Sequence, residues 1–149
     1  MNTVLTDIKP RLVLDTNVIL DLLVFKDRTA EPIWHLLDAK LVDAVRSEAS
    51  MLELIDVIQR PTFKLNQEEQ VIILQAWESV TRLLENEAME PAPFTCRDLD
   101  DQVFLDMAYS IQPALLLSKD LRVLELRSIA KPHGVEISNQ YDRLQTLPG

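Results

Sequence analysis

Two aspartates each follow a short apolar run and precede a helical segment. Asp15 comes directly after the run 12–14. Asp120 lies two residues after Ser118, which ends the run 114–118. Compact apolar runs of this kind predict strands covered on both faces of a parallel sheet. Ligands of such sheets bind outside the carboxyl ends of the strands. If the two strands are adjacent, both carboxylates lie within reach of a single cation. Alternatively, each aspartate only caps the helix that follows it.

Asp101 is the acid with the strongest geometric argument, because it shares a helical face with Leu105 and Ala108. Its carboxylate is expected to point along this apolar stripe, where a charged group must pair, take up a proton or bind a metal. The alternative is a first-turn acid attracted by the positive end of the helix dipole. Asp98, one turn earlier, could join the site, whereas Asp106 is expected to face solvent.

Glu53 is the acid that spacing does not assign to a site. It lies well away from the centre of the apolar face of its helix, which residues 51, 54, 55 and 58 form. It could instead close a capping box with Ser50. From spacing alone, this structural role is favoured.

Acids without clustered histidines or thiols indicate a hard cation such as Mg²⁺ or Mn²⁺, which takes oxygen ligands. Such an ion orients and polarises a phosphodiester and lowers the pKa of an attacking water. The two histidines and the single cysteine, Cys96, show no zinc-site spacing. The two glycines, Gly134 and Gly149, cannot build a glycine-rich phosphate loop. The residues therefore favour metal-dependent chemistry.

Length and composition predict a single domain over residues 1–149, with its core at about 11–146. Hydrophobic residues make up 47% of the 149 residues, enough to fill a core. The single cysteine fits a reducing compartment, and no apolar run approaches the roughly 20 residues of a membrane helix. We therefore expect a cytoplasmic protein with no membrane partner. The net charge of -9 argues against a broad electrostatic footprint for nucleic acid. It suits a soluble surface, a basic partner segment or acids gathered around a cation.

The candidate residues must be positioned by strands and helices that alternate along the chain. The predicted strands are 11–14, 41–46, 114–118 and 135–137, with a short edge strand at 94–96. The predicted helices are 18–24 with Thr16 or Asn17 as its cap, one to 37 from Thr29 or Ala30, one to 58 from Ser47 or Ser50, 66–87, one from residue 98, 121–130, and a short segment at 141–144. The helix 66–87 begins with a capping box at Asn66 and Glu69, and residues 71, 74, 77, 80, 83 and 84 form its inner face. This order indicates an α/β fold with a parallel sheet of four or five strands, after a short disordered lead-in over residues 1–10.

Four blocks of the sequence, in this order, resemble a PIN domain. They are 14–18 around Asp15, 47–61 around Glu53, 97–108 around Asp101, and 117–121 around Asp120. The branch that they resemble is described as the toxin components of toxin–antitoxin systems, the VapC-like ribonucleases. The resemblance covers roughly residues 11–126. It implies a three-layer α/β/α fold, Mg²⁺ or Mn²⁺ as cofactor, and cleavage of single-stranded RNA.

The resemblance also implies roles for particular residues. Four acids correspond to the catalytic and metal-binding set of the family: Asp15, Glu53, Asp101 and Asp120. Three of their neighbours are candidates for substrate binding: Asn17, Ser118 and Lys119. The resemblance thereby makes Glu53 a site residue rather than a cap. The sequence departs from the family pattern at Lys119, where glycine is frequent, and at Asp21, where a small residue or serine is frequent. Lys119 could contact a phosphate or pair with an acid, and Asp21 could add charge or face solvent.

The leading hypothesis is a metal-dependent endoribonuclease whose partners are RNA, a cognate antitoxin with a basic segment, and a second copy in a homodimer. Arg97, Lys119 and Arg122 are candidate phosphate contacts. The alternative is a catalytically weak or inactive PIN-like module that binds RNA or a protein. An enzyme with an aspartyl nucleophile is disfavoured, because such enzymes place a second acid two residues after the first, and that position holds the amide Asn17.

Overall fold

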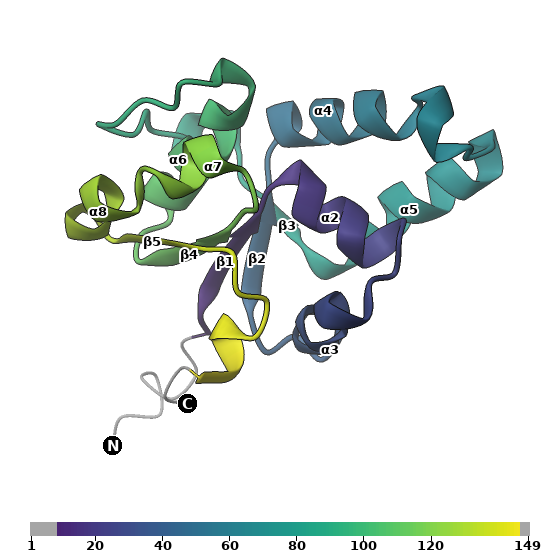
Figure 1. Cartoon of the computed structure of the whole chain (residues 1–149), viewed down its shortest axis with the longest axis horizontal. Helices are drawn as coiled ribbons and strands as arrows, with labels where there is room; N and C mark the ends of the chain where they lie inside the picture. Colours follow the sequence, from purple (N-terminus) through teal and green to yellow (C-terminus); the bar gives the residue numbers. More distant parts are fainter. Residues whose placement is uncertain (1–8, 147–149) are drawn as a thin grey trace.

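The centre of the protein is a five-stranded parallel sheet with the strand order β3-β2-β1-β4-β5 (Figure 1). The computed structural model describes residues 9–146, with side chains up to Leu144. The strands are β1 (Arg11–Leu14), β2 (Asp43–Arg46), β3 (Arg82–Leu83), β4 (Ala114–Leu117) and β5 (Val135–Ser138). The predicted parallel sheet of four or five strands is therefore confirmed. Most of the lead-in expected over residues 1–10 lies outside the described residues.

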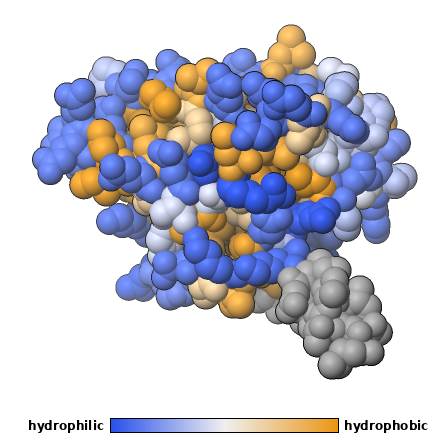
Figure 2. Space-filling model, turned by 180° about the vertical axis from the view of Figure 1, so that it is seen from behind, coloured by the Kyte–Doolittle hydropathy of each residue, from blue (hydrophilic) through white to orange (hydrophobic). Residues whose placement is uncertain are grey.

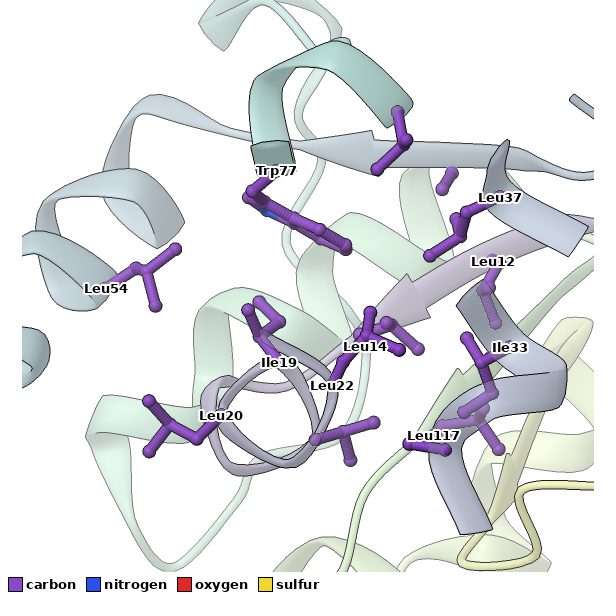
Figure 3. Packing of buried hydrophobic residues seen from close by; sticks show 14 of the residues in the cluster. Leu12, Leu14, Ile19, Leu20, Leu22, Ile33, Leu37, Leu54, Trp77 and Leu117 are labelled. Atoms are coloured by element: carbon purple, nitrogen blue, oxygen red, sulfur yellow. The ribbon is translucent and has the colours of Figure 1, made fainter. Parts of the chain in front are cut away.

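Seven helices within residues 9–146 cover the two faces of the sheet, which gives the expected three-layer α/β/α fold (Figure 1). They are α2 (Thr16–Leu23), α3 (Glu31–Asp38), α4 (Glu48–Ile58), α5 (Gln67–Val80), α6 (Gln102–Ser110), α7 (Leu121–Leu124) and α8 (Arg127–Ala130). Side chains alternate along a strand, so β1 contributes to two cores. Leu12 and Leu14 pack with α2, α3, α4 and α5 (Figure 3), whereas Val13 packs with α6, α7 and α8.

Capping boxes begin two of the helices that support the first core. In α4, the Ser47 hydroxyl oxygen accepts the N–H of Ser50 at 3.1 Å, and Ser50 Oγ accepts the N–H of Ser47 at 2.8 Å. In α5, Asn66 and Glu69 form the predicted capping box at 2.8 and 3.0 Å. These bonds satisfy amide groups that a helix start otherwise leaves unpaired. The start of α5 was thus predicted from the sequence, whereas for α4 the sequence left Ser47 and Ser50 open and the structure selects Ser47.

Helix α5 ends at Val80, and the prediction that it continues to residue 87 is wrong. Thr81 adopts an extended backbone, and its hydroxyl donates to the carbonyl of Trp77 at 2.7 Å. Arg46 of β2 donates to the carbonyl of Thr81, also at 2.7 Å. The chain then forms β3 on the open edge of β2. The edge of the sheet satisfies backbone groups here, and this non-local pairing outweighs the local helical pattern.

The buried face of α5 also differs from the predicted one. Ile73, Trp77 and Val80 are buried, at the spacing i, i+4, i+7 of one helical face. Val71, which was expected inside, has 46% of its surface exposed. Adjacent apolar faces of this helix offer similar periodicity, and packing against α2 and α4 selects one of them.

The predicted edge strand at 94–96 does not form, because one side chain takes the hydrogen bonds that a neighbouring strand would supply. Gln102 Oε1 accepts the N–H of Cys96 at 2.7 Å, and Gln102 Nε2 donates to the carbonyl of Phe94 at 3.1 Å. The same amide donates to Asp106 Oδ1 at 3.0 Å, and Asp106 accepts the N–H of Ala92 at 2.9 Å. Asp106 is therefore half-buried and fastens the preceding loop. The expectation that it faces solvent is wrong.

The remaining elements agree with the sequence in position more than in detail. A 3-10 turn at Leu99–Asp101 leads into α6, and the single helix predicted over 121–130 is divided into α7 and α8. The short final segment is a 3-10 turn at Arg143–Thr146. No helix within residues 9–146 is long and apolar enough to cross a membrane. Seen from behind, the surface is largely hydrophilic, with apolar side chains in scattered patches (Figure 2).

Candidate functional site

Strands β1 and β4 are neighbours, so the residues that follow them lie at the same edge of the sheet. The register pairs Leu14 with Leu117, and the N–H of Asp15 donates to the carbonyl of Leu117 at 3.2 Å. Asp120 follows β4 and caps α7 by accepting the N–H of Arg122 at 2.8 Å. The adjacency on which the prediction depended is therefore found, and both acids stand at the carboxyl edge of the sheet.

Asp15 is 2% exposed and uses its two carboxylate oxygens differently. Oδ1 accepts the N–H of Val18 at 3.0 Å and caps α2, so the predicted cap at Thr16 or Asn17 is wrong. Oδ2 accepts a hydrogen bond from the hydroxyl of Ser118. Burial raises the pKa of Asp15 above its ordinary value, and the two hydrogen bonds oppose this shift by stabilising the charged form.

Three acids bring carboxylate oxygens within 4.8 Å of one another: Asp98, Asp101 and Asp120, which we call the acidic cluster. Asp98 caps the 3-10 turn before α6, and Asp101 ends that turn. The sequence assigned Asp101 and Asp120 to the site, and it gave Asp98 only as an acid that could join them. The dense run of acids at 98–101, directly before a helix, is the signal that pointed to Asp98.

Asp101 carries the one buried side-chain oxygen or nitrogen, among the described residues, that has no hydrogen-bond partner, its Oδ2. Burial raises the pKa of Asp101 to about 7, and a hydrogen bond with Asp120 and the negative charges of Asp120, Asp98 and Asp15 act in the same direction. Leu105, on the same helical face, is fully buried, which agrees with a carboxylate aimed along an apolar stripe. An unsatisfied oxygen surrounded by other acids is a group that needs a cation or a proton.

Glu53 reaches the same edge of the sheet from α4. Its Oε2 accepts the hydroxyl of Thr16 at 2.9 Å, so it stands next to the residue that follows Asp15. Burial raises the pKa of Glu53, and the charges of Asp100, Asp15 and Asp98 add to that shift. The alternative that Glu53 closes a capping box with Ser50 is wrong, because Ser50 already forms that box with the residue before the helix.

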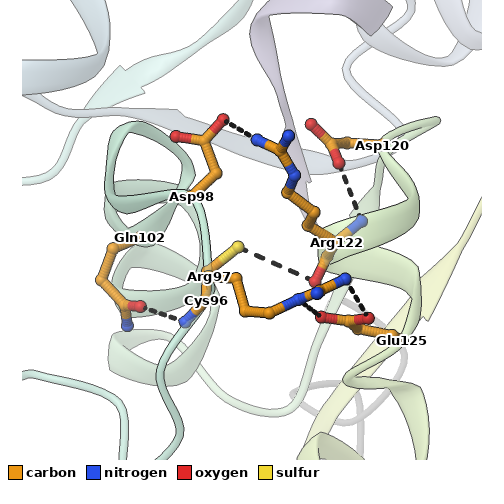
Figure 4. A network of polar contacts seen from close by, with 7 residues as sticks. All are labelled: Cys96, Arg97, Asp98, Gln102, Asp120, Arg122 and Glu125. Carbon is orange, nitrogen blue, oxygen red and sulfur yellow. Dashed lines mark hydrogen bonds and ion pairs between the residues drawn. The ribbon is translucent and has the colours of Figure 1, made fainter.

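Cations of the same chain engage one acid of the cluster, Asp98, and one acid beside it, Glu125. Arg122 Nη1 lies 3.1 Å from Asp98 Oδ2, and Arg97 forms a bidentate pair with Glu125 at 2.7 and 2.9 Å (Figure 4). The buried Cys96 thiol donates to the carbonyl of Arg122, and burial raises its pKa, so it remains a thiol rather than a metal-binding thiolate.

The donor set of the acidic cluster fits a hard divalent cation. All its donors are carboxylate oxygens, and the Asp101 oxygen has no other partner. Asp98, Asp101 and Asp120 would hold the ion, with Asp15 within electrostatic range, since its charge raises the pKa of Asp101. When bound, such an ion orients a phosphodiester and stabilises the negative charge that develops during hydrolysis. The chain itself supplies the buried position and the hydroxyl of Ser118 that orients Asp15.

The fold and the site together define a class of protein, a three-layer α/β/α domain with carboxylates gathered at the carboxyl edge of its parallel sheet. Residues 11–122 match the family model described as "PIN domain". The match covers most of the chain, and the protein belongs to the PIN domain family. Membership of this nuclease family supports a hydrolase that acts with a divalent metal, in agreement with the acidic cluster.

A solved structure has a similar fold. It is described as the crystal structure of VapBC2 from Rickettsia felis bound to a DNA fragment from their promoter. The similarity has a TM-score of 0.57 at 14% sequence identity, and it covers 86% of this chain and 97% of that chain. At this identity the likeness concerns the fold. A comparison with curated proteins found no match.

Proposed function

We propose that this PIN domain is a Mg²⁺- or Mn²⁺-dependent endoribonuclease that cleaves single-stranded RNA. The observation that carries the proposal is the unpartnered, buried Asp101 oxygen in a cluster of acids at the carboxyl edge of the sheet. We assign the catalytic, metal-holding role to the four acids of the family pattern, Asp15, Glu53, Asp101 and Asp120. Asp98 joins them on geometric grounds.

Three further residues have proposed roles next to these acids. Ser118 is fully buried, donates to Asp15 and accepts the N–H of Asp120 at 3.1 Å, so it serves as a positioning residue for both acids. Asn17 is exposed in the first turn of α2, where its amide is accessible to substrate. Lys119, between Ser118 and Asp120, is also exposed and offers an ammonium group for substrate binding.

We further propose that the protein is the toxin of a toxin–antitoxin pair that acts in the cytoplasm and forms a homodimer. The likeness of its fold to a chain of the VapBC2 structure supports the toxin–antitoxin part of this proposal. The net charge of -9 suits an antitoxin segment that carries basic residues and reaches the acidic site.

The test is cleavage of end-labelled single-stranded RNA by the purified protein, with Mn²⁺ and with EDTA. We expect Mn²⁺-dependent cleavage that falls about a hundredfold or more in Asp15→Asn and in Asp101→Asn. Asp38→Asn removes an exposed carboxylate from α3 and is the matched control with full activity. Equal cleavage by all four proteins would indicate a contaminating nuclease and would overturn the proposal that this protein is the nuclease.

One observation favours the alternative, a PIN-like module that binds RNA or a protein with little or no catalysis. The ion pair between Arg122 and Asp98 neutralises one acid of the cluster. The two functions differ in the effect of Arg122→Gln. For the nuclease, the variant frees Asp98 and retains metal-dependent cleavage, whereas a binding module cleaves RNA in neither form.

A further inference from the structure

Asp21, Lys119 and Tyr141 meet at one carboxylate oxygen. The ammonium of Lys119 forms an ion pair with Asp21 Oδ2, and the hydroxyl of Tyr141 donates to the same oxygen at 2.6 Å. The three residues come from α2, from the loop between β4 and α7, and from the segment after β5. They are separated by 98 and 120 positions in the sequence. The contact therefore joins three distant parts of the chain, next to Asp120 of the acidic cluster.

The contact relates the two positions at which the sequence departs from the PIN pattern. Only 9% of the Asp21 side chain is exposed, and a carboxylate this buried requires compensating partners. Lys119 supplies the charge, and Tyr141 supplies a neutral hydrogen bond. Burial and the hydrogen bond with Asp21 raise the pKa of Tyr141, so its hydroxyl remains a donor. Asp21 and Lys119 thus form an ion pair with each other. Lys119 pairs with an acid, and Asp21 is a buried charge rather than a solvent-facing one.

The ammonium is nevertheless accessible and lies close to the site acids. The Lys119 side chain is 47% exposed. Its positive charge acts on Asp15 and offsets a small part of the rise in pKa that burial causes in that carboxyl. An ammonium has three N–H donors, and within the described part of the chain Lys119 donates one hydrogen bond, to Asp21. The guanidinium groups of Arg97 and Arg122 are likewise paired, but their partners Glu125 and Asp98 have side chains that are 40% and 29% exposed, against 9% for Asp21.

We infer that Asp21 and Tyr141 hold Lys119 in place as a contact for the phosphate backbone of the nucleic-acid substrate, next to the bond that is cleaved. The inference rests on the proposed function. An acidic site on a protein of net charge -9 repels a polyanion, and a fixed cation next to Asp120 reduces this repulsion. Lys119 contacts the substrate, whereas Asp21 and Tyr141 are positioning residues that act through it.

The first test measures the binding of a fluorescein-labelled single-stranded RNA of mixed sequence by fluorescence anisotropy, in EDTA and between 50 and 200 mM NaCl. Steady-state cleavage of RNA is measured separately in Mn²⁺. Loss of one phosphate contact lowers the slope of log affinity against log salt by about 0.7. We expect this change in Lys119→Gln, with KM raised roughly fivefold and kcat unchanged. Lys119→Arg is expected to retain the wild-type slope. Lys131→Gln removes an exposed charge from another part of the chain and should change neither quantity.

The double variant Asp21→Asn with Lys119→Gln provides a second route if Lys119→Gln alone does not fold. It replaces the ion pair by two amides and leaves the net charge unchanged, so a lower salt slope would again report the lost contact. Tyr141→Phe tests positioning without a change of charge. We expect KM to rise about twofold at unchanged kcat and unchanged slope, whereas Tyr109→Phe on α6, the matched control, leaves KM unaltered.

The outcomes separate this inference from the proposed function. Wild-type protein that binds and cleaves RNA, with the same slope and KM in Lys119→Gln, would overturn the contact role and leave the nuclease intact. Lys119 would then serve only to compensate the buried Asp21, and the variants would differ in melting temperature alone. Wild-type protein that neither binds nor cleaves RNA would overturn both.

Discussion

Replacing Asp101 by asparagine is expected to stabilise the metal-free protein at pH 8. The wild-type carboxyl has its pKa raised to about 7, chiefly by burial and then by Asp120, Asp98 and Asp15. At pH 8 it is ionised against this preference and repels its neighbours. An asparagine has nearly the same shape and no charge. Its NH₂ group can donate a hydrogen bond to the neighbouring carboxylate of Asp120.

The magnitude follows from the size of the pKa shift. A rise from 3.8 to about 7 is roughly three pH units, and each unit corresponds to about 1.4 kcal/mol, which sets an upper limit of about 4 kcal/mol. Asp101 is partly exposed, so water screens the repulsion, and we expect about 1–2 kcal/mol. For a domain of this size, that gain raises the melting temperature by about 3–6 °C.

The sign of the pH dependence is fixed by the same shift. The folded protein holds the Asp101 proton more tightly than the unfolded chain, whose pKa is about 3.9. The free energy of unfolding of the wild type therefore falls as pH rises from about 4 to about 7. Asp101→Asn lacks this contribution. Its advantage over the wild type should be larger at pH 8 than at pH 5.

The assay is urea denaturation in EDTA at both pH values, with Asp38→Asn as a control for the removal of one exposed negative charge. That control should differ from wild type by less than about 0.5 kcal/mol. A second readout uses Mn²⁺, which should stabilise the wild type and leave Asp101→Asn nearly unchanged. An Asp101→Asn protein that is less stable than wild type at pH 8 in EDTA would show that its carboxylate is satisfied in the fold, and the reasoning from the unpartnered oxygen would fail.

Three other perturbations test the same structure. Addition of Mn²⁺ to the wild type at about a hundred times its Kd should raise the free energy of unfolding by about 2.7 kcal/mol, measured by denaturation and reversed by EDTA. Ser118→Ala leaves Asp15 Oδ2 buried without its donor and should cost about 1–3 kcal/mol in urea denaturation. Trp77→Ala empties the centre of the core beneath α2 and should cost about 3–5 kcal/mol, measured in the same way (Figure 3).

The parts of the fold that the sequence predicted are those with strong local signals. Apolar runs identified β1 and β4, and their side chains are almost completely buried. Capping residues identified the start of α5 and restricted the start of α4 to two serines. Because parallel strands end at one edge, these signals placed Asp15 and Asp120 at the same edge of the sheet. That the two strands are neighbours was a condition of the prediction, and the pairing of β1 with β4 meets it. The layered architecture follows from the same alternation of strands and helices.

The elements that the sequence missed depend on partners far along the chain. Strand β3 forms because β2 has an open edge, and Arg46 fixes the carbonyl at the end of α5. The segment 94–96 lacks a strand because Gln102 provides its hydrogen bonds. The secondary-structure propensities of neighbouring residues predict neither the pairing of β3 with β2 nor the hydrogen bonds from Gln102. Glu53 differs from these elements, because spacing favoured a cap while the family resemblance assigned it to the site. Its contact with Thr16, 37 positions away, brings it to the carboxyl edge of the sheet.

Capping and participation in the site are compatible for an aspartate, although the sequence presented them as alternatives. A carboxylate has two oxygens, and an N-cap uses one. Asp15 gives Oδ1 to the N–H of Val18 and keeps Oδ2 for the hydroxyl of Ser118. Asp120 gives Oδ1 to the N–H of Arg122 and still offers a carboxylate oxygen to the acidic cluster. The cap fixes the orientation of the side chain, which is what a ligand for a metal ion requires. The cap therefore prepares the second oxygen for the site, and evidence for capping is no evidence against a functional role at the end of a buried strand.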